Sequence, residues 1–85
     1  MNKVVLITGG SSGIGKSIGE FLHHKGFVVY GTSRNPDRIL NSVFPLVALD
    51  VRDADSIHAA VAKVISISGR LDVVINNAGV GITGP

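Results

Sequence analysis

A glycine- and serine-rich segment, residues 8–15, follows the apolar run 3–7 and precedes an amphipathic stretch. Glycine allows a sharp backbone turn and places no Cβ between backbone N–H groups and an anion. A helix that begins directly behind such a turn adds unpaired N–H donors and a partial positive charge. The segment therefore predicts a strand-to-helix turn that binds phosphate, with Gly9, Gly13 and Gly15 as its glycines.

Two phosphate-binding motifs fit these residues. The pattern Thr-Gly-x-x-x-Gly-x-Gly matches residues 8–15, and the Walker A pattern Gly-x-x-x-x-Gly-Lys-Ser matches residues 10–17. The apolar run 45–49 also ends in Asp50, as does a strand that holds magnesium in a nucleotide hydrolase. The motifs alone leave both dinucleotide binding and nucleotide hydrolysis open.

The residues after the second predicted strand favour a dinucleotide. An acidic residue about 20 positions beyond the glycine turn hydrogen-bonds the adenosine ribose in folds that bind NAD. This chain has Ser33, Arg34 and Asn35 there instead. An arginine fork and a serine hydroxyl offer donors to a phosphate, which is the local chemistry of NADP recognition. An exposed arginine beside a loop is the alternative interpretation.

Composition limits the class of protein. The 85 residues are 45% apolar and 16% charged, carry a net charge of +2 and include no cysteine, which indicates one small packed domain without disulfides or thiolate metal sites. The charges are scattered, so we expect no nucleic-acid partner. We also expect no metal site, no membrane span and a cytoplasmic location.

Apolar runs and helical patterns alternate along the chain. The predicted strands are residues 4–8, 27–32, 46–49 and 72–75. Helices are predicted from Ile14 to a stop at Lys25-Gly26, from Asn35 to Leu40, and from an N-cap at Asp53 to a stop at Gly69. The predicted buried faces are Ile14, Ile18, Phe21 and Leu22 in the first helix, and Ile57, Ala60, Val61, Val64 and Ile65 in the last.

Continuously apolar strands joined by helices predict a parallel sheet covered on both faces. The fold class is therefore α/β, the first half of a Rossmann-type doubly wound sheet with strand order 3-2-1-4. Tyr30, the only tyrosine, falls within the second strand and is expected in the core or on a sheet face.

The chain resembles the short-chain dehydrogenase/reductase family over its whole length. Four features carry the resemblance in order: residues 8–15, Ser33-Arg34, Asp50-Val51, and the Asn-Asn-Ala-Gly sequence of residues 76–79. A nucleotide hydrolase gives no reason for the second and fourth of these. The resemblance implies an NADP-dependent oxidoreductase that acts on a small alcohol or carbonyl substrate and forms a homo-oligomer.

The resemblance also assigns roles to residues. It implies that residues 11–14 lie nearest the pyrophosphate, that Asp50 accepts a hydrogen bond from the adenine amine, and that the Val51 backbone contacts the ring edge. Small residues 77–79 leave room for the ribose and adenine side of the dinucleotide. The expected cofactor-binding residues are Gly9, Ser11, Ser12, Gly13, Ile14, Gly15, Ser33, Arg34, Asn35, Asp50, Val51, Asn77, Ala78 and Gly79.

The catalytic residues of the family, a serine and a Tyr-x-x-x-Lys pair, are not among these 85 residues. We therefore expect residues 1–85 to be the N-terminal half of an NADP-binding Rossmann domain, a fragment of a longer chain that is inactive alone. A non-catalytic dinucleotide-binding module stays open as the alternative function.

Overall fold

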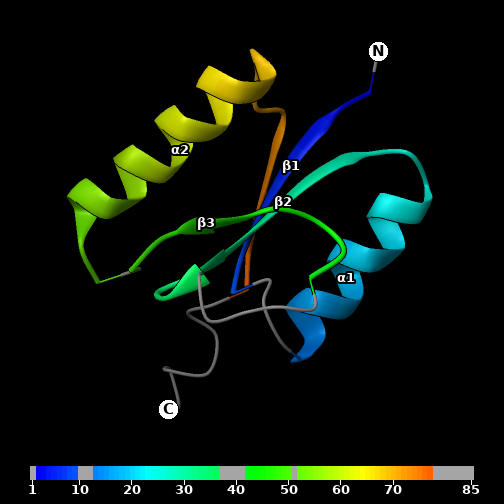
Figure 1. The fold of residues 1–85 in the computed structure, drawn as a ribbon, viewed down its shortest axis with the longest axis horizontal. Helices are drawn as coiled ribbons and strands as arrows, with labels where there is room; N and C mark the ends of the chain where they lie inside the picture. The colour runs from blue at the N-terminus through cyan, green and yellow to red at the C-terminus, as the bar shows by residue number, and fades with distance from the viewer. Residues whose placement is uncertain (1, 10–12, 37–41, 51, 78–85) are drawn as a thin grey trace.

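A four-stranded parallel sheet forms the centre of the molecule in the computed structural model, which describes residues 2–9, 13–36, 42–50 and 52–77 (Figure 1). The strands are β1 (Val4–Thr8), β2 (Val28–Ser33), β3 (Leu46–Ala48) and β4 (Val73–Asn76), and the helices are α1 (Gly13–His24) and α2 (Ala54–Ser68). The order β3-β2-β1-β4 confirms the predicted strand order and α/β class. All three strand pairings are parallel.

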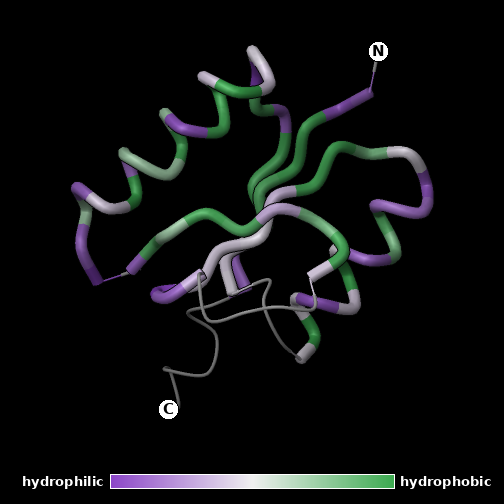
Figure 2. Tube along the Cα trace, viewed as in Figure 1, coloured by the Kyte–Doolittle hydropathy of each residue, from purple (hydrophilic) through white to green (hydrophobic). Residues whose placement is uncertain are grey.

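The core has two layers because the side chains of β1 alternate between the two faces of the sheet. Val4 and Leu6 belong to a cluster that includes Ala60 and Val64 of α2. Val5 and Ile7 belong to a second cluster on the other face, against which apolar side chains of α1 pack. Figure 2 shows the strands as a hydrophobic centre with a helix on either side, so the sheet is covered on both faces as predicted.

Helix α1 packs through part of the predicted face together with two glycines. Ile18 and Leu22 lie against the core, but Ile14 is 72% exposed and Phe21 is 61% exposed. The buried residues of α1 are Gly15 and Gly19. At about 100° per residue, the face that contains both glycines and Ile18 turns Ile14 and Phe21 outward. Glycines without side chains let the helix axis approach the sheet closely, which an apolar count cannot predict.

Helix α2 begins and ends as predicted. The Asp53 side chain accepts a hydrogen bond from the Asp55 N–H at 3.0 Å, and the Gly69 N–H donates to the Ile65 carbonyl at 2.7 Å. Ala60 and Val64 are buried, whereas the predicted face residues Ile57 and Ile65 are 37% and 44% exposed. The packed stripe of α2 is therefore narrower than predicted.

The remaining predictions concern element boundaries. Strands β2 and β4 each begin and end one residue later than predicted, and β3 ends one residue earlier. The helix predicted for residues 35–40 falls largely outside the described residues.

Tyr30 is buried, and its hydroxyl lies 2.6 Å from the Ser68 hydroxyl, which confirms its expected place in the core. Neither of the two helices that the structure describes is long and apolar enough to cross a membrane.

Candidate functional site

The carboxyl ends of the four strands meet at one edge of the sheet, because all the strands run in the same direction. Thr8 at the end of β1 pairs with Asn76 of β4, and Ser33 at the end of β2 pairs with Ala48 of β3. The glycine turn, the loop after β2 and the Asp50 loop all leave from this edge. Open parallel sheets bind ligands at such an edge, where the chain order reverses on either side of the first strand.

Two threonine hydroxyls hold the centre of this edge together. The Thr8 hydroxyl donates to Asn76 Oδ1 at 3.1 Å and accepts from the Asn77 backbone N–H at 2.8 Å. The Thr32 hydroxyl accepts from the Gly9 N–H at 2.9 Å. These bonds tie β1 to the start of the β4 loop and the start of the glycine turn to β2. The sequence marks neither role, because a threonine at a strand end is common and its partners are distant in the chain.

In the described parts of the glycine turn, the backbone has a conformation that residues other than glycine rarely adopt. Gly9 has φ 72° and Gly13 has φ 59°, both in the left-handed region that favours glycine. A Cβ built on Gly13 has no neighbour within 4 Å, so its surroundings among the described residues are open. A Cβ on Gly15 would instead lie 2.5 Å from the Gly9 carbonyl oxygen and 2.7 Å from Asn77 Nδ2. Gly15 therefore lets the helix, the turn and the β4 loop meet.

The loop after β2 presents a cation and a hydroxyl. Ser33 is half-buried and its hydroxyl accepts from the Asn35 N–H at 3.2 Å, which bends the chain back after the strand. The hydroxyl proton stays available to another acceptor, because this bond uses only a lone pair. Arg34 and Asn35 are exposed. The arrangement offers one guanidinium and one hydroxyl donor to an anion at the edge of the sheet.

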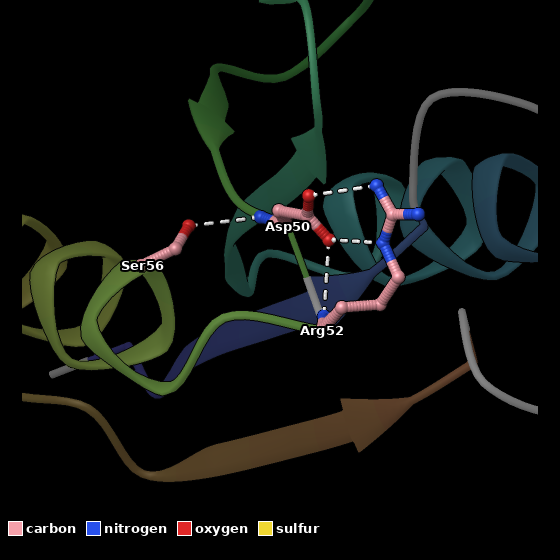
Figure 3. A network of polar contacts seen from close by, with 3 residues as sticks. All are labelled: Asp50, Arg52 and Ser56. Carbon is pink, nitrogen blue, oxygen red and sulfur yellow. Dashed lines mark hydrogen bonds and ion pairs between the residues drawn. The ribbon is translucent and has the colours of Figure 1, made fainter.

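Asp50 lies at the end of β3 in a small polar network (Figure 3). Its Oδ1 accepts from the Arg52 backbone N–H at 3.0 Å and from Arg52 Nε at 3.1 Å, and its Oδ2 accepts from Arg52 Nη2 at 3.0 Å. The Asp50 backbone N–H donates to the Ser56 hydroxyl at 2.8 Å. Both the main chain and the carboxylate of Asp50 are therefore held from the segment that leads into α2.

Hydrogen bonds from the side chain and the backbone of Arg52 lower the pKa of Asp50 to about 2 from the ordinary 3.8, and the positive charges of Arg52 and Arg34 add to the effect. A carboxyl whose folded pKa is depressed stabilises the fold at every pH above its unfolded value. This contribution is lost as the pH falls from about 4 through about 2.

We expect Arg52→Gln to raise the pKa of Asp50 toward 3.8, because the variant removes the guanidinium that favours the ionised form. The measurement is the pH titration of the Asp50 carboxyl carbon by NMR in both proteins. Arg70→Gln is the control, since it removes a second exposed arginine that pairs with an aspartate two residues away. An Asp50 midpoint that is the same in the Arg52 variant and the parent contradicts the assignment.

The described edge contains most of the residues predicted to bind the cofactor. Gly9 follows β1, and Gly13, Ile14 and Gly15 begin α1. Ser33, Arg34 and Asn35 lie at or after the end of β2, Asp50 follows β3, and Asn77 follows β4. Ser11, Ser12, Val51, Ala78 and Gly79 lie outside the described residues. Sequence reasoning missed Arg52 and Ser56; the Asp-x-Arg spacing was the available signal, but only the fold of the loop brings the two charges together.

The magnesium-site interpretation of Asp50 does not fit this arrangement. Strand β3 is separated from β1 by β2, so with strands about 4.8 Å apart Asp50 follows a strand about 10 Å from the one that leads into the glycine turn. Its carboxylate is also bound by Arg52. Asp50 therefore lies along the same edge of the sheet as the glycine turn, with its carboxylate paired to a cation.

An extended dinucleotide matches this edge. The N-terminus of α1 suits a pyrophosphate, since no described residue lies close to a Cβ at Gly13. The donors at Ser33 and Arg34 suit a phosphate on the ribose, and the acceptor at Asp50 suits an amine. The residues present therefore fit the nicotinamide dinucleotide that the sequence predicts.

Comparison with known proteins places the chain among reductases and dehydrogenases. The short chain dehydrogenase family model matches residues 3–85. The 3-ketodihydrosphingosine reductase of Bacteroides thetaiotaomicron is 49% identical over 82 residues, which cover 96% of this chain and 30% of that protein. The chain thus spans about 30% of the length of this curated relative.

Solved structures have the same architecture. The ligand-free aldohexose dehydrogenase of Thermoplasma acidophilum superposes with a TM-score of 0.81 and 29% identity, covering 89% of this chain and 29% of that one. The 3-ketoacyl-(acyl-carrier-protein) reductase of Brucella melitensis, solved in complex with NADH, has a TM-score of 0.74 and 28% identity, covering 85% of this chain and 32% of that one.

Proposed function

The chain belongs to the short-chain dehydrogenase family, and from that membership we propose that it forms the adenosine- and pyrophosphate-binding part of an NADP-dependent oxidoreductase. The substrate we propose is a small alcohol or carbonyl compound. The Bacteroides thetaiotaomicron relative, a 3-ketodihydrosphingosine reductase, supports a carbonyl substrate. We further propose that the protein is a homo-oligomer.

The observation that carries the choice of NADP is the loop after β2. Where an acidic residue would accept hydrogen bonds from the ribose hydroxyls and repel a phosphate, Arg34 supplies a cation and Ser33 a hydroxyl. The Arg34 side chain is exposed at the edge where the strands end, and so is free to contact a phosphate. A guanidinium fork matches phosphate oxygens in charge and geometry.

The other assignments use the same edge. We propose that residues 9–15 bind the pyrophosphate through the backbone of the turn and the N-terminus of α1, with the exposed Ile14 side chain beside it. Asp50 and Val51 contact the adenine. Asn77, Ala78 and Gly79, which follow β4 in the sequence, are proposed to leave room for the ribose and adenine side of the dinucleotide. When bound, the nicotinamide supplies or accepts the hydride.

Tyr30 has no part in this chemistry. Its hydroxyl is buried and shares a hydrogen bond with Ser68, which ends α2. Because α2 begins at Ala54, close after the end of β3, and runs back toward the start of β4, Ser68 lies away from the edge that binds the cofactor. We therefore place the proton donor of the reaction outside these 85 residues. A protein that binds the dinucleotide without catalysis is the alternative, and an assay of NADPH oxidation with ketone substrates, using the complete gene product, separates the two.

We expect Arg34→Ala to weaken NADPH binding by about tenfold to a hundredfold and to change NADH binding little, because a hydrogen bond to a charged group contributes roughly 1.5 to 3 kcal/mol. The measurement is the dissociation constant of each reduced cofactor for the complete gene product, followed by nicotinamide fluorescence. Lys63→Ala, which removes an exposed cation from α2, is the control for net charge. Equal losses for the two cofactors in the Arg34 variant would refute the NADP assignment.

A further inference from the structure

Arg52 and Asp50 form an exposed ion pair that contains three hydrogen bonds. The Arg52 side chain is 71% exposed, and that of Asp50 is 34% exposed. Ion pairs this exposed add little to stability. Yet Arg52 donates to both carboxylate oxygens through its side chain and to Oδ1 again through its backbone N–H. Three bonds from one residue to one carboxylate fix the orientation of that carboxylate.

The contacts leave Asp50 with a defined remaining capacity to accept hydrogen bonds. A carboxylate has about four acceptor positions, two on each oxygen. Among the described residues, Oδ1 receives two donors and Oδ2 receives one, all from Arg52. One acceptor position on Oδ2 is left for a ligand. A single N–H donor fits this position, whereas a carbonyl oxygen is repelled by the negative charge.

Without Arg52 the carboxylate would turn more freely, because the terminal torsion of an aspartate side chain is broad. Ser56 accepts from the Asp50 N–H and so holds the main chain, but it makes no bond to the carboxylate. Figure 3 shows these two contacts on opposite sides of Asp50: Ser56 faces its backbone, and the Arg52 guanidinium faces its carboxylate.

We propose that Arg52 is a positioning residue for base selection, which holds the Asp50 carboxylate so that its free acceptor position on Oδ2 meets the exocyclic amine of adenine. The proposal rests on the proposed function, in which Asp50 contacts that amine. It makes Arg52 responsible for the preference of the site for adenine over a base that carries a carbonyl in place of the amine.

The test compares NADPH with its hypoxanthine analogue, in which a carbonyl oxygen replaces the amine. Both ligands contain the same reduced nicotinamide, so its fluorescence reports both dissociation constants for the complete gene product. The ratio of the two constants is the adenine preference. A general loss of structure weakens both ligands and leaves this ratio unchanged, whereas loss of Asp50 orientation lowers the ratio.

We expect Arg52→Gln to lower the adenine preference by about tenfold, which corresponds to loss of one charge-assisted hydrogen bond. Arg52→Lys should lower it less, because the ammonium retains the charge but lacks the planar fork. Asp50→Asn should abolish or invert it, since an amide can donate to the carbonyl of hypoxanthine.

Arg70→Gln is the matched control. Arg70 donates to Asp72 through Nε at 3.1 Å and Nη2 at 2.6 Å, and this pair precedes β4, at the opposite edge of the sheet. Its loss should leave the adenine preference unchanged.

An Arg52→Gln variant that keeps the full adenine preference, or that weakens both ligands equally, overturns the proposal while leaving the proposed function intact. An Asp50→Asn variant with unchanged preference also overturns it. If the parent protein binds neither ligand, the proposed function fails and this proposal fails with it. If the parent binds NADH as tightly as NADPH, only the NADP assignment fails, and the same ratio is measured with NADH and its hypoxanthine analogue.

Discussion

Gly15→Val is expected to weaken NADPH binding by roughly a hundredfold or more, because overpacking of this size costs about 3 kcal/mol. A Cβ at this position would lie 2.5 Å from the Gly9 carbonyl oxygen, which is backbone of the glycine turn, and 2.7 Å from Asn77 Nδ2. Neither neighbour is the end of a long flexible side chain. The glycine turn and the β4 loop must therefore move away from the start of α1, and this movement distorts the proposed pyrophosphate site.

The dissociation constant of NADPH for the complete gene product is the measurement. Lys16→Ala is the control, because it changes the next residue of the same helix without adding atoms. The control also tests the Walker A interpretation, in which Lys16 contacts the phosphates. Unchanged NADPH affinity in the Gly15 variant would show that the close contact between the glycine turn, α1 and the β4 loop is not needed for binding. A large loss of affinity in the Lys16 variant would favour the nucleotide-hydrolase motif.

Gly19→Val is expected to lower the free energy of unfolding by about 3 kcal/mol, at the upper end of the usual cost of overpacking. A Cβ on Gly19 would lie 2.5 Å from both Cε2 and Cζ of Phe44 and 3.3 Å from Cδ1 of Ile7. Phe44 is only 3% exposed and Ile7 is fully buried, so the ring has no open space into which to swing. The clash must separate α1 from the sheet.

Urea unfolding of the complete gene product measures this effect, and Ser17→Val is the control. Ser17 is an exposed residue of α1, so its variant introduces the same β-branched side chain into the helix without the clash. In a Phe44→Ala background Gly19→Val should cost less than it does in the parent, because the ring that the new side chain meets is gone. A Gly19 variant as stable as the Ser17 control would contradict the close packing of α1 on the sheet.

Much of the fold follows from local patterns. The runs that begin at Val4, Val28, Leu46 and Val73 are apolar and rich in β-branched residues, and helical segments separate most of them, so a parallel sheet is the arrangement that buries both faces. The ends of α2 were predictable too, because Asp53 and Gly69 act through contacts within one helical turn. Short-range interactions of this kind are contained in the sequence pattern itself.

The location of the candidate site was also predictable in outline. Parallel strands bring their carboxyl ends to one edge, so the residues after β1, β2, β3 and β4 had to be neighbours in space. The types of those residues, with glycines after β1 and Ser33-Arg34 after β2, indicated the ligand class. The sequence thus determined the fold class, the edge that carries the candidate site and the chemical groups offered there.

Tertiary structure decided how closely the elements approach and which polar groups pair. The pattern of α1 predicted Ile14, Ile18, Phe21 and Leu22 in the core. Ile18 and Leu22 do pack there beside two buried glycines, but Ile14 and Phe21 are exposed. Phe44 became a core residue because the absence of a side chain at Gly19 leaves room for its ring. The Asp-x-Arg spacing alone did not indicate that Asp50 and Arg52 pair through three hydrogen bonds. A linear pattern records which side chains are present, whereas interhelical distances and loop shapes result from the packing of the whole molecule.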